Sequence, residues 1–372
     1  MKINVSNRRR KKLRIAQIAP LNSAVEPDPR YATTGIIYYL TEGLRKKGHE
    51  VTLFASGDSQ TSAKLVALTP SVVNEKDLSE KQKQKGYRAY LYNFALAARA
   101  YRQWQEFDII HIHLGNNGQV EGLFFSDLAP VPTIASVQCM FDELMPEIVQ
   151  SFQKKVTFVA LSKDHLEKAQ PLKSKTFIYN GIDVNKFSYG KDPSDYLLFL
   201  SRLHPNKGAL TAVKVAKKLR LPIKVAGHRS TSRPEYYQAI LKEKGRRAEL
   251  ISEVDLPTKI KLYQRAKALI FPVQIDEPFG LVMIEAMACG TPVVAFGRGS
   301  VPEIVEDGKT GFVVKPGDLA GLAKAVKKIY EMPQKDYLAL RQRCRKRVEE
   351  KFSIGRMVDH YEELYLKVRG EK

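Results

Sequence analysis

The sequence predicts an α/β protein that contains two doubly wound parallel sheets. Strand-like apolar runs alternate with helix-like segments almost throughout its 372 residues. This alternation is typical of parallel sheets with helices on both faces. The length allows two domains of ordinary size. Residues 179–187 carry turn chemistry and separate the first alternating block from the second. Two blocks joined by one short linker predict two Rossmann-like domains that face a central cleft.

The first block contains apolar runs with the length and composition of buried strands. We expect strands at 13–19, 50–55, 108–113, 132–137, 157–161 and 176–179. The segments between them have helical periodicity, most clearly 35–47 and about 80–104. A basic tail, 1–12, precedes the first strand, and we assign 13–183 to the first domain.

The second block repeats this pattern. We expect strands at 196–200, 223–226, 249–251, 268–272 and 292–295, and a further strand after Gly308. We assign 184–353 to the second domain and 354–372 to a C-terminal segment, whose helix covers about 354–368.

A formal net charge of +21 indicates either an anionic partner or a basic surface without one. Basic clusters lie at 8–12, 45–47, 246–247 and 341–347. Nucleic acid and an anionic membrane surface are both candidates. The sequence contains no zinc finger, aromatic RNA-binding signature or evident DNA-reading helix, so nucleic acid is the less favoured partner.

The predicted helix at about 80–104 combines aromatic and basic residues. Tyr90, Leu91 and Phe94 have helical spacing, and Lys81 and Arg88 are among the basic residues beside them. A helix of this kind can lie on a membrane. The alternative is a helix that packs on its own sheet.

Composition also bears on where the protein works. Cys139, Cys289 and Cys344 are far apart, so neither a disulfide framework nor a zinc spacing follows, and a reducing cytosol is expected. No apolar run approaches the roughly 20 residues that a membrane-spanning helix needs. The basic N-terminus lacks the apolar region of a secretory signal. We expect a cytoplasmic protein, with peripheral attachment to the inner face of the membrane as a further expectation.

Two common nucleotide motifs are excluded. No G-x-G-x-x-G follows the first strand, which disfavours a nicotinamide enzyme. Gly308-Lys309-Thr310 matches the end of a P-loop, but Glu303 stands where glycine is required and a strand is predicted to follow.

The clearest candidate site lies at 277–296. An apolar run at 268–273 predicts a buried strand, so Glu277 sits in the loop at the carboxyl end of this strand, where open α/β sheets bind ligands. A helix is predicted from Gly280, and Glu285 falls about a turn and a half inside it. The N–H groups of Phe279, Gly280 and Leu281 would be unpaired at the helix start and could bind an anion.

The two carboxylates can accept hydrogen bonds from sugar hydroxyls on either side of that anion. The alternative is that Glu277 is an acid favoured by the helix dipole and that Glu285 is incidental.

Arg202 and Lys207 follow the predicted strand at 196–200, so they lie at the same sheet edge. Arginine offers a fork for phosphate oxygens and lysine offers a point charge. The alternative for them is ordinary basic decoration of a helix start.

His111 and His113 alternate on a predicted strand, so both side chains point to one face. Taken alone, they are favoured as core or edge histidines rather than ligands. Two histidines at this spacing could bind a metal, but no third ligand stands out. We therefore expect no metal site.

The letters around these residues resemble a known family. The segment that starts Glu277-Pro278-Phe279-Gly280 and reaches Glu285 closely resembles the nucleotide-sugar signature of family 4 glycosyltransferases, the retaining enzymes of the GT-B fold. Further segments match the family pattern in the same order along the chain. Residues 200–208 resemble the family's diphosphate-binding Arg and Lys, and 299–313 resemble the stretch after the paired glutamates. Residues 47–55 and 108–113 resemble the family's N-terminal landmarks. The resemblance runs from about Leu13 and is most specific in the second half.

The resemblance implies a GT-B fold and a nucleotide-diphosphate sugar, UDP- or GDP-linked, as co-substrate without another cofactor. It implies that the C-terminal helix crosses back to the first domain. Glu277 would hold hydroxyls of the sugar ring and Glu285 the ribose, while Arg202 and Lys207 would stabilise charge on the leaving diphosphate. The other implied donor contacts are the amides of Phe279, Gly280 and Leu281, Gly227, Gly35, and His113 across the cleft. No Asp-x-Asp metal clamp occurs, so transfer is expected to be metal-independent.

Two segments of the first half depart from the family pattern. Tyr31-Ala32-Thr33-Thr34-Gly35 stands where a Gly-Gly pair is usual, and Ser136-Val137-Gln138-Cys139-Met140 stands where Thr-x-His-Gly is usual. The leading hypothesis is a retaining hexosyltransferase that acts on a lipid, glycan or small-molecule acceptor. The alternative is a non-catalytic nucleotide-sugar sensor or scaffold with a degenerate acceptor domain. A nucleic-acid-binding protein is a third hypothesis, which rests on charge alone.

Overall fold

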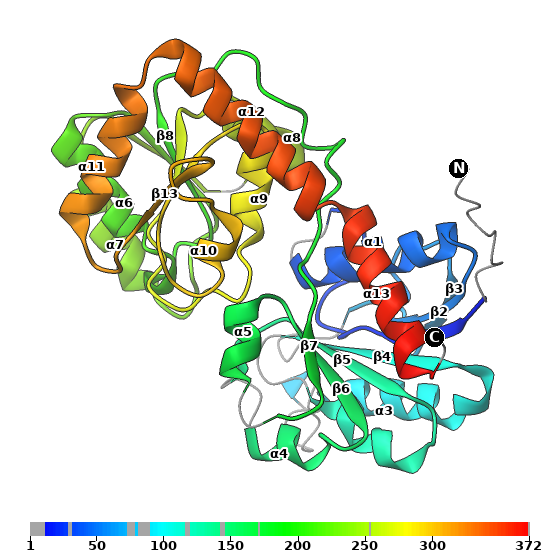
Figure 1. Ribbon diagram of the computed structural model, residues 1–372. Coiled ribbons are helices and arrows are strands. Elements are labelled where there is room, and N and C mark those ends of the chain that lie inside the picture. The colour runs from blue at the N-terminus through cyan, green and yellow to red at the C-terminus, as the bar shows by residue number, and fades with distance from the viewer. Residues whose placement is uncertain are drawn as a thin grey trace, which may run out of the picture. The chain divides into compact units, whose positions relative to one another are not determined.

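The computed structural model describes residues 12–28, 32–72, 79–80, 90–115, 120–141, 146–169, 172–252 and 254–370. The chain divides into two compact units, each built around one sheet (Figure 1). Unit 1 contains 1–159, 171–176 and 358–372, and unit 2 contains 160–170 and 177–357. The predicted fold class of two doubly wound α/β domains is confirmed.

Unit 1 contains a seven-stranded sheet with the order β3-β2-β1-β4-β5-β6-β7. β1 pairs in parallel with both β2 and β4, so the strand order reverses direction between β1 and β4. In sheets of this topology, ligands bind outside the carboxyl ends of the strands at the point of reversal. The strands are β1 (Arg14–Ile18), β2 (Glu50–Ala55), β3 (Lys64–Ala67), β4 (Ile109–Leu114), β5 (Thr133–Val137), β6 (Val156–Ala160) and β7 (Lys175–Phe177).

Two long helices of unit 1, α1 (Ala32–Lys46) and α3 (Tyr90–Arg102), each bury one apolar face. In α1, Ile36, Ile37, Leu40 and Leu44 are buried at helical spacing. The helices of this unit are α1 (Ala32–Lys46), α3 (Tyr90–Arg102), η2 (Trp104–Glu106), η3 (Glu121–Leu128), α4 (Pro146–Ser151) and the part of α13 (Ile354–Val368) from Val358 onward.

The helix predicted at about 80–104 is described from Tyr90 as α3. One face, which includes Leu96 and Tyr101, is buried, as expected for a helix that packs on its own sheet. Tyr90 and Leu91 are 48% and 43% exposed. Lys81 and Arg88 lie outside the described residues.

Unit 2 contains a six-stranded sheet with the order β10-β9-β8-β11-β12-β13. Its pairs are parallel, and here the order reverses between β8 and β11. The strands are β8 (Leu197–Leu200), β9 (Ile223–Ala226), β10 (Ala248–Ile251), β11 (Ala268–Phe271), β12 (Val293–Phe296) and β13 (Gly311–Val314). The helices are α5 (Lys163–Lys168), η5 (Pro205–Lys207), α6 (Ala209–Leu219), α7 (Pro234–Glu243), α8 (Leu256–Arg265), α9 (Leu281–Ala288), α10 (Val301–Ile304), α11 (Leu319–Tyr330) and α12 (Gln334–Lys351).

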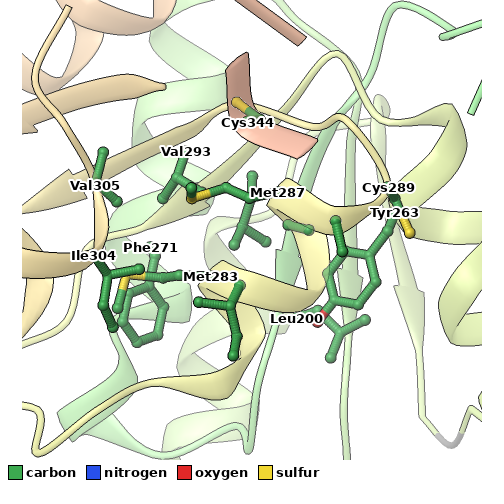
Figure 2. Close-up of a cluster of buried hydrophobic side chains, with 14 of the residues drawn as sticks. Leu200, Tyr263, Phe271, Met283, Met287, Cys289, Val293, Ile304, Val305 and Cys344 are labelled. Carbon is green, nitrogen blue, oxygen red and sulfur yellow. The ribbon is translucent and has the colours of Figure 1, made fainter. Parts of the chain in front are cut away.

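Helices cover both faces of the unit 2 sheet (Figure 1). Successive strand residues point to opposite faces, so Leu197 and Phe199 join a core with α6, α7 and α11. Leu198 and Leu200 join the core that contains α8 and α9. Figure 2 shows this second core, in which Met283 and Met287 of α9 lie among buried side chains of the sheet. α9 is thereby fixed against the strands that lead to the candidate site.

None of the helices in the described ranges is both long and apolar enough to cross a membrane.

Candidate active site

The candidate donor residues surround the point where the unit 2 sheet reverses its strand order. Arg202 and Lys207 follow β8, and Glu277 follows β11, the strand beside β8. Because β8 and β11 are parallel neighbours, both loops leave the sheet at the same edge. This is the edge at which doubly wound sheets bind ligands.

Lys207 and Glu277 form an ion pair. The distance from Lys207 Nζ to Glu277 Oε2 is 2.5 Å, and the two side chains are 18% and 12% exposed. Two glycines bring the supporting backbones close together. Gly208 has a φ of +83°, and a Cβ there would lie 2.0 Å from the carbonyl oxygen of Pro272. Gly299 has a φ of +57°, and a Cβ there would lie 2.4 Å from the backbone nitrogen and oxygen of Glu277. Larger residues at these positions would push the pair apart.

Arg202 lies exposed at this edge, and no described residue forms an ion pair with it. Gly227, which follows β9, packs against the backbone just before Arg202, because a Cβ there would lie 1.9 Å from Ser201 O. Partial burial, with the nearby cations Arg202, Arg233 and Lys207, lowers the pKa of His204. Arg202 and Lys207 therefore place cationic groups after β8 that can attract phosphate.

The start of α9 offers backbone donors beside the ion pair. Gly280 has a φ of +78° and is the N-cap residue of α9. The N–H groups of Phe279 and Gly280 find no acceptor among the described residues. The carbonyl of Phe279 accepts a hydrogen bond from Ser300 Oγ at 2.8 Å, which fixes the loop. Free N–H groups at a helix start can bind an anion.

Glu285 lies in the second turn of α9 and is 7% exposed. Both of its carboxylate oxygens have partners on α8. Lys259 Nζ donates to Oε1 at 2.9 Å, and the Tyr263 hydroxyl donates to Oε2 at 2.9 Å. Burial, and then the adjacent Glu285, raises the pKa of Tyr263 well above its usual value, so the phenol remains a donor.

Lys259 and Tyr263 were not predicted from the sequence as site residues. Their spacing of four residues places them on one helix face, but nothing in the sequence identifies Glu285 as the group they contact.

His113 and Gly35 belong to unit 1. His113 lies at the carboxyl end of β4 and is 3% exposed. Its Nε2 donates to Gln17 Oε1 at 2.6 Å, and no described residue is hydrogen-bonded to its Nδ1. Burial lowers the pKa of His113 to about 3, so the ring is neutral. Gly35 is buried in the first turn of α1, where Ala32 to Gly35 form helix and Tyr31 lies outside the described residues.

His111 and His113 share one face of the sheet, as predicted, with ring centroids 4.1 Å apart. His111 Nδ1 lies 2.6 Å from the hydroxyl of Tyr365, and its Nε2 lies 2.6 Å from Ser136 Oγ. Ser136 Oγ lies 2.7 Å from the hydroxyl of Tyr361. The departure at Ser136 therefore belongs to a buried polar network with the C-terminal helix.

Three arginines of α12 bind backbone carbonyl oxygens inside unit 2. Arg341 is fully buried and donates to Gly190 O at 2.6 Å and Cys289 O at 3.5 Å. Arg345 donates to Ala288 O at 3.0 Å, and Arg347 donates to Ile304 O at 2.7 Å. The carbonyls of Ala288, Cys289 and Ile304 lie at the carboxyl ends of α9 and α10, where cations are stabilising, whereas Gly190 precedes β8. The basic cluster at 341–347 is thus largely used inside unit 2 and is not a free anionic-partner surface.

Across the described ranges, no group of three or more His, Cys, Asp or Glu side chains is arranged to hold a metal ion.

Two family models match the chain. Residues 182–351 match "Glycosyl transferases group 1", and residues 36–186 match "Glycosyltransferase Family 4". The chain belongs to the family 4 glycosyltransferases. This bears out the resemblance to that family.

Curated relatives agree with this assignment. The chain is 26% identical over 336 residues to a D-inositol 3-phosphate glycosyltransferase from Mycobacterium sp. (strain KMS), covering 78% of this chain and 76% of that protein. It is 33% identical over 181 residues to a glycogen synthase from Mycobacterium tuberculosis (strain CDC 1551 / Oshkosh), covering 45% of this chain. The match spans 43% of the length of that glycogen synthase.

Solved structures share the fold. Sucrose-phosphate synthase from Thermosynechococcus elongatus has a TM-score of 0.76 at 18% identity, covering 96% of this chain and 99% of that one. Anabaena Alr3699/HepE in complex with UDP and glucose has a TM-score of 0.71 at 18% identity, covering 95% and 99%. The fold is therefore that of the GT-B glycosyltransferases.

Proposed function

We propose that this chain transfers a hexose from a nucleotide-diphosphate sugar to an acceptor, with retention of anomeric configuration and without a bound metal. The observation that carries the proposal is the Lys207–Glu277 ion pair at the β8/β11 edge. It joins a cation suited to phosphate and a carboxylate suited to sugar hydroxyls. Arg202 and the free N–H groups at the start of α9 lie at the same edge.

The proposed donor is supported by chemistry and by comparison. A diphosphate needs cations and N–H donors, which Arg202, Lys207, Phe279 and Gly280 can supply. Anabaena Alr3699/HepE, a structure of the same fold, was solved with UDP and with UDP-glucose. The proposal includes both UDP- and GDP-sugars as donors.

In the proposed mechanism, each residue has a distinct task. Arg202 and Lys207 stabilise the negative charge that develops on the leaving diphosphate, which is transition-state electrostatics. Glu277, released from Lys207 as the phosphate enters, accepts hydrogen bonds from the sugar ring. The amides of Phe279, Gly280 and Leu281 orient the donor, and Glu285 holds the ribose. No side chain is assigned as a covalent nucleophile, so the acceptor attacks from the face that the diphosphate leaves.

The acceptor is proposed only by class: a lipid, a glycan or a small molecule. The named relatives include enzymes for glycogen and for inositol phosphate, and these acceptors differ widely. A nucleotide-sugar panel read out by thermal shift identifies the donor first, since a ligand of the native state raises its stability. Turnover of that donor with candidate acceptors then separates an enzyme from a non-catalytic sensor. Donor binding without transfer or hydrolysis would favour the sensor.

An anionic membrane surface is the proposed partner of the basic charge. The arginines of α12 bind carbonyls, so we assign this role to the tail at 1–12 and the basic residues at 81–88 rather than to the cluster at 341–347. Sedimentation should show binding to anionic but not neutral vesicles, weakening as salt rises. Deleting 1–12 should weaken it, and moderate RNA should not displace the vesicles. Binding that survives the deletion, Lys81/Lys83/Lys85→Glu and high salt would refute this role.

A further inference from the structure

Glu285 is held by two side chains that have no assigned role. Lys259 and Tyr263 are four residues apart on α8, so they share one helix face. That face meets Glu285, and each residue donates to a different carboxylate oxygen at 2.9 Å. The three side chains form a closed carboxylate clamp between α8 and α9.

The clamp is rigid on both sides. Asp255 caps the start of α8 by accepting a hydrogen bond from Thr258 N at 2.9 Å. Tyr263 is fully buried, and its carbonyl accepts a hydrogen bond from Thr291 Oγ1 at 2.5 Å. Figure 2 shows Tyr263 within the apolar core beside Leu200. Lys259 retains a 22% exposed side chain beside the 10% exposed side chain of Glu285. The clamp therefore reaches the surface at Lys259, while Tyr263 anchors it in the core.

The number of contacts leaves the carboxylate able to bind a diol. An ionised carboxylate has about four acceptor positions on its two oxygens. The described residues use one position on each oxygen. One free position on each oxygen matches two adjacent hydroxyl groups. Two fixed donors also prevent the carboxylate from rotating away from them.

We propose that Lys259 and Tyr263 are positioning residues that orient Glu285 for the 2′- and 3′-hydroxyls of the donor ribose, so that the clamp selects ribonucleotides over 2′-deoxyribonucleotides. This inference rests on the proposed function, because Glu285 binds ribose only if the donor is a nucleotide sugar. The clamp accounts for a preference for ribonucleotides and takes no part in the transfer of the sugar. Lys259 acts through Glu285 and does not touch the phosphate or the base.

The test compares a nucleoside diphosphate with its 2′-deoxy form by calorimetry. UDP, GDP and ADP are each titrated beside dUDP, dGDP and dADP. The unaltered protein should favour the ribose form about ten-fold or more, the range for one hydrogen bond to a charged group. Lys259→Met should weaken ribose-form binding about ten-fold and change deoxy-form binding less than two-fold. Tyr263→Phe should act in the same direction, and Lys259→Arg should recover part of the preference.

Lys261→Met is the matched control, since Lys261 is an exposed lysine on the same helix. It should leave both affinities unchanged. Thermal unfolding of each variant shows that it is folded at the titration temperature. Equal loss of both nucleotide forms in Lys259→Met would overturn the inference, because Lys259 would then contact the phosphate or the base. A protein that binds nucleotides but does not distinguish ribose from deoxyribose would also overturn it, and would leave the proposed function standing. No binding of any nucleotide would overturn both.

Discussion

Removing the two donor-site cations one at a time should separate catalysis from stability. Lys207 and Glu277 are paired at 2.5 Å with side chains 18% and 12% exposed. Lys207→Ala therefore leaves a largely buried carboxylate without its partner. This should cost about 1–3 kcal/mol of unfolding free energy, and about 2–4 °C of Tm per kcal/mol for a domain of this size. Arg202 is exposed without a described ion pair, so Arg202→Ala should change stability by less than about 0.5 kcal/mol.

Both substitutions should nevertheless lower turnover similarly. Each removes a preorganised charge from the leaving diphosphate, and such losses cost on the order of 100-fold in rate. Release of nucleoside diphosphate from the selected donor measures the rate, and differential scanning calorimetry measures the Tm. Lys214→Ala, an exposed lysine on α6, is the control and should change neither. Loss of activity with EDTA while Arg202→Ala and Lys207→Ala keep normal rates would refute the metal-independent mechanism.

Three further predictions concern the two glutamates, His113 and Arg341. Glu285→Ala should mainly weaken nucleoside-diphosphate binding, because a ribose contact is the same before and during reaction, whereas Glu277→Ala should mainly lower the rate; equal losses of calorimetric affinity would refute this division. The pKa of His113 falls from 6.5 in the unfolded chain to about 3 in the folded protein, because burial disfavours the charged ring. Below pH 6.5 the unfolded chain therefore binds a proton that the folded protein does not bind. The free energy of unfolding then falls by up to about 1.4 kcal/mol per pH unit until about pH 3. Urea unfolding between pH 7 and 5 should show this slope, flattened in His113→Gln; an unchanged slope would contradict it. Arg341→Met leaves buried carbonyls unpaired and should cost about 2–4 kcal/mol, while Arg343→Met, which loses one exposed contact, should cost under about 1 kcal/mol; equal Tm values would show that the carbonyl contacts of Arg341 do not stabilise unit 2.

Buried strands and strongly periodic helices were predictable from the sequence. β2, β9 and α13 have the predicted bounds, because apolar runs and helical periodicity report burial directly. β3 was not predicted. It has four residues, and only Val66 among them is buried, so it has no apolar run to detect. The sheet edge shared by Arg202 and Glu277 was also predictable, since parallel strands fix which loops meet.

Contacts set by packing between helices were not predictable. The basic run at 341–347 has the composition of a solvated face, yet Arg341 is fully buried. Its carbonyl partners come from Gly190 and Cys289, which are far away in the sequence. The partnership of Lys259 with Glu285 is of the same kind, because only the packing of α8 on α9 brings them together.

In the proposed function, the β8/β11 edge of unit 2 binds the diphosphate of a nucleotide sugar. The most direct measurement is the thermal shift of the unaltered protein and of Arg202→Ala with a panel of nucleotide sugars. We expect at least one nucleotide sugar, at about 100 times its Kd, to stabilise the unaltered protein by about 2.7 kcal/mol. The same concentration should have little effect on Arg202→Ala. No shift with any nucleotide sugar, or an equal shift in both proteins, would contradict the claim.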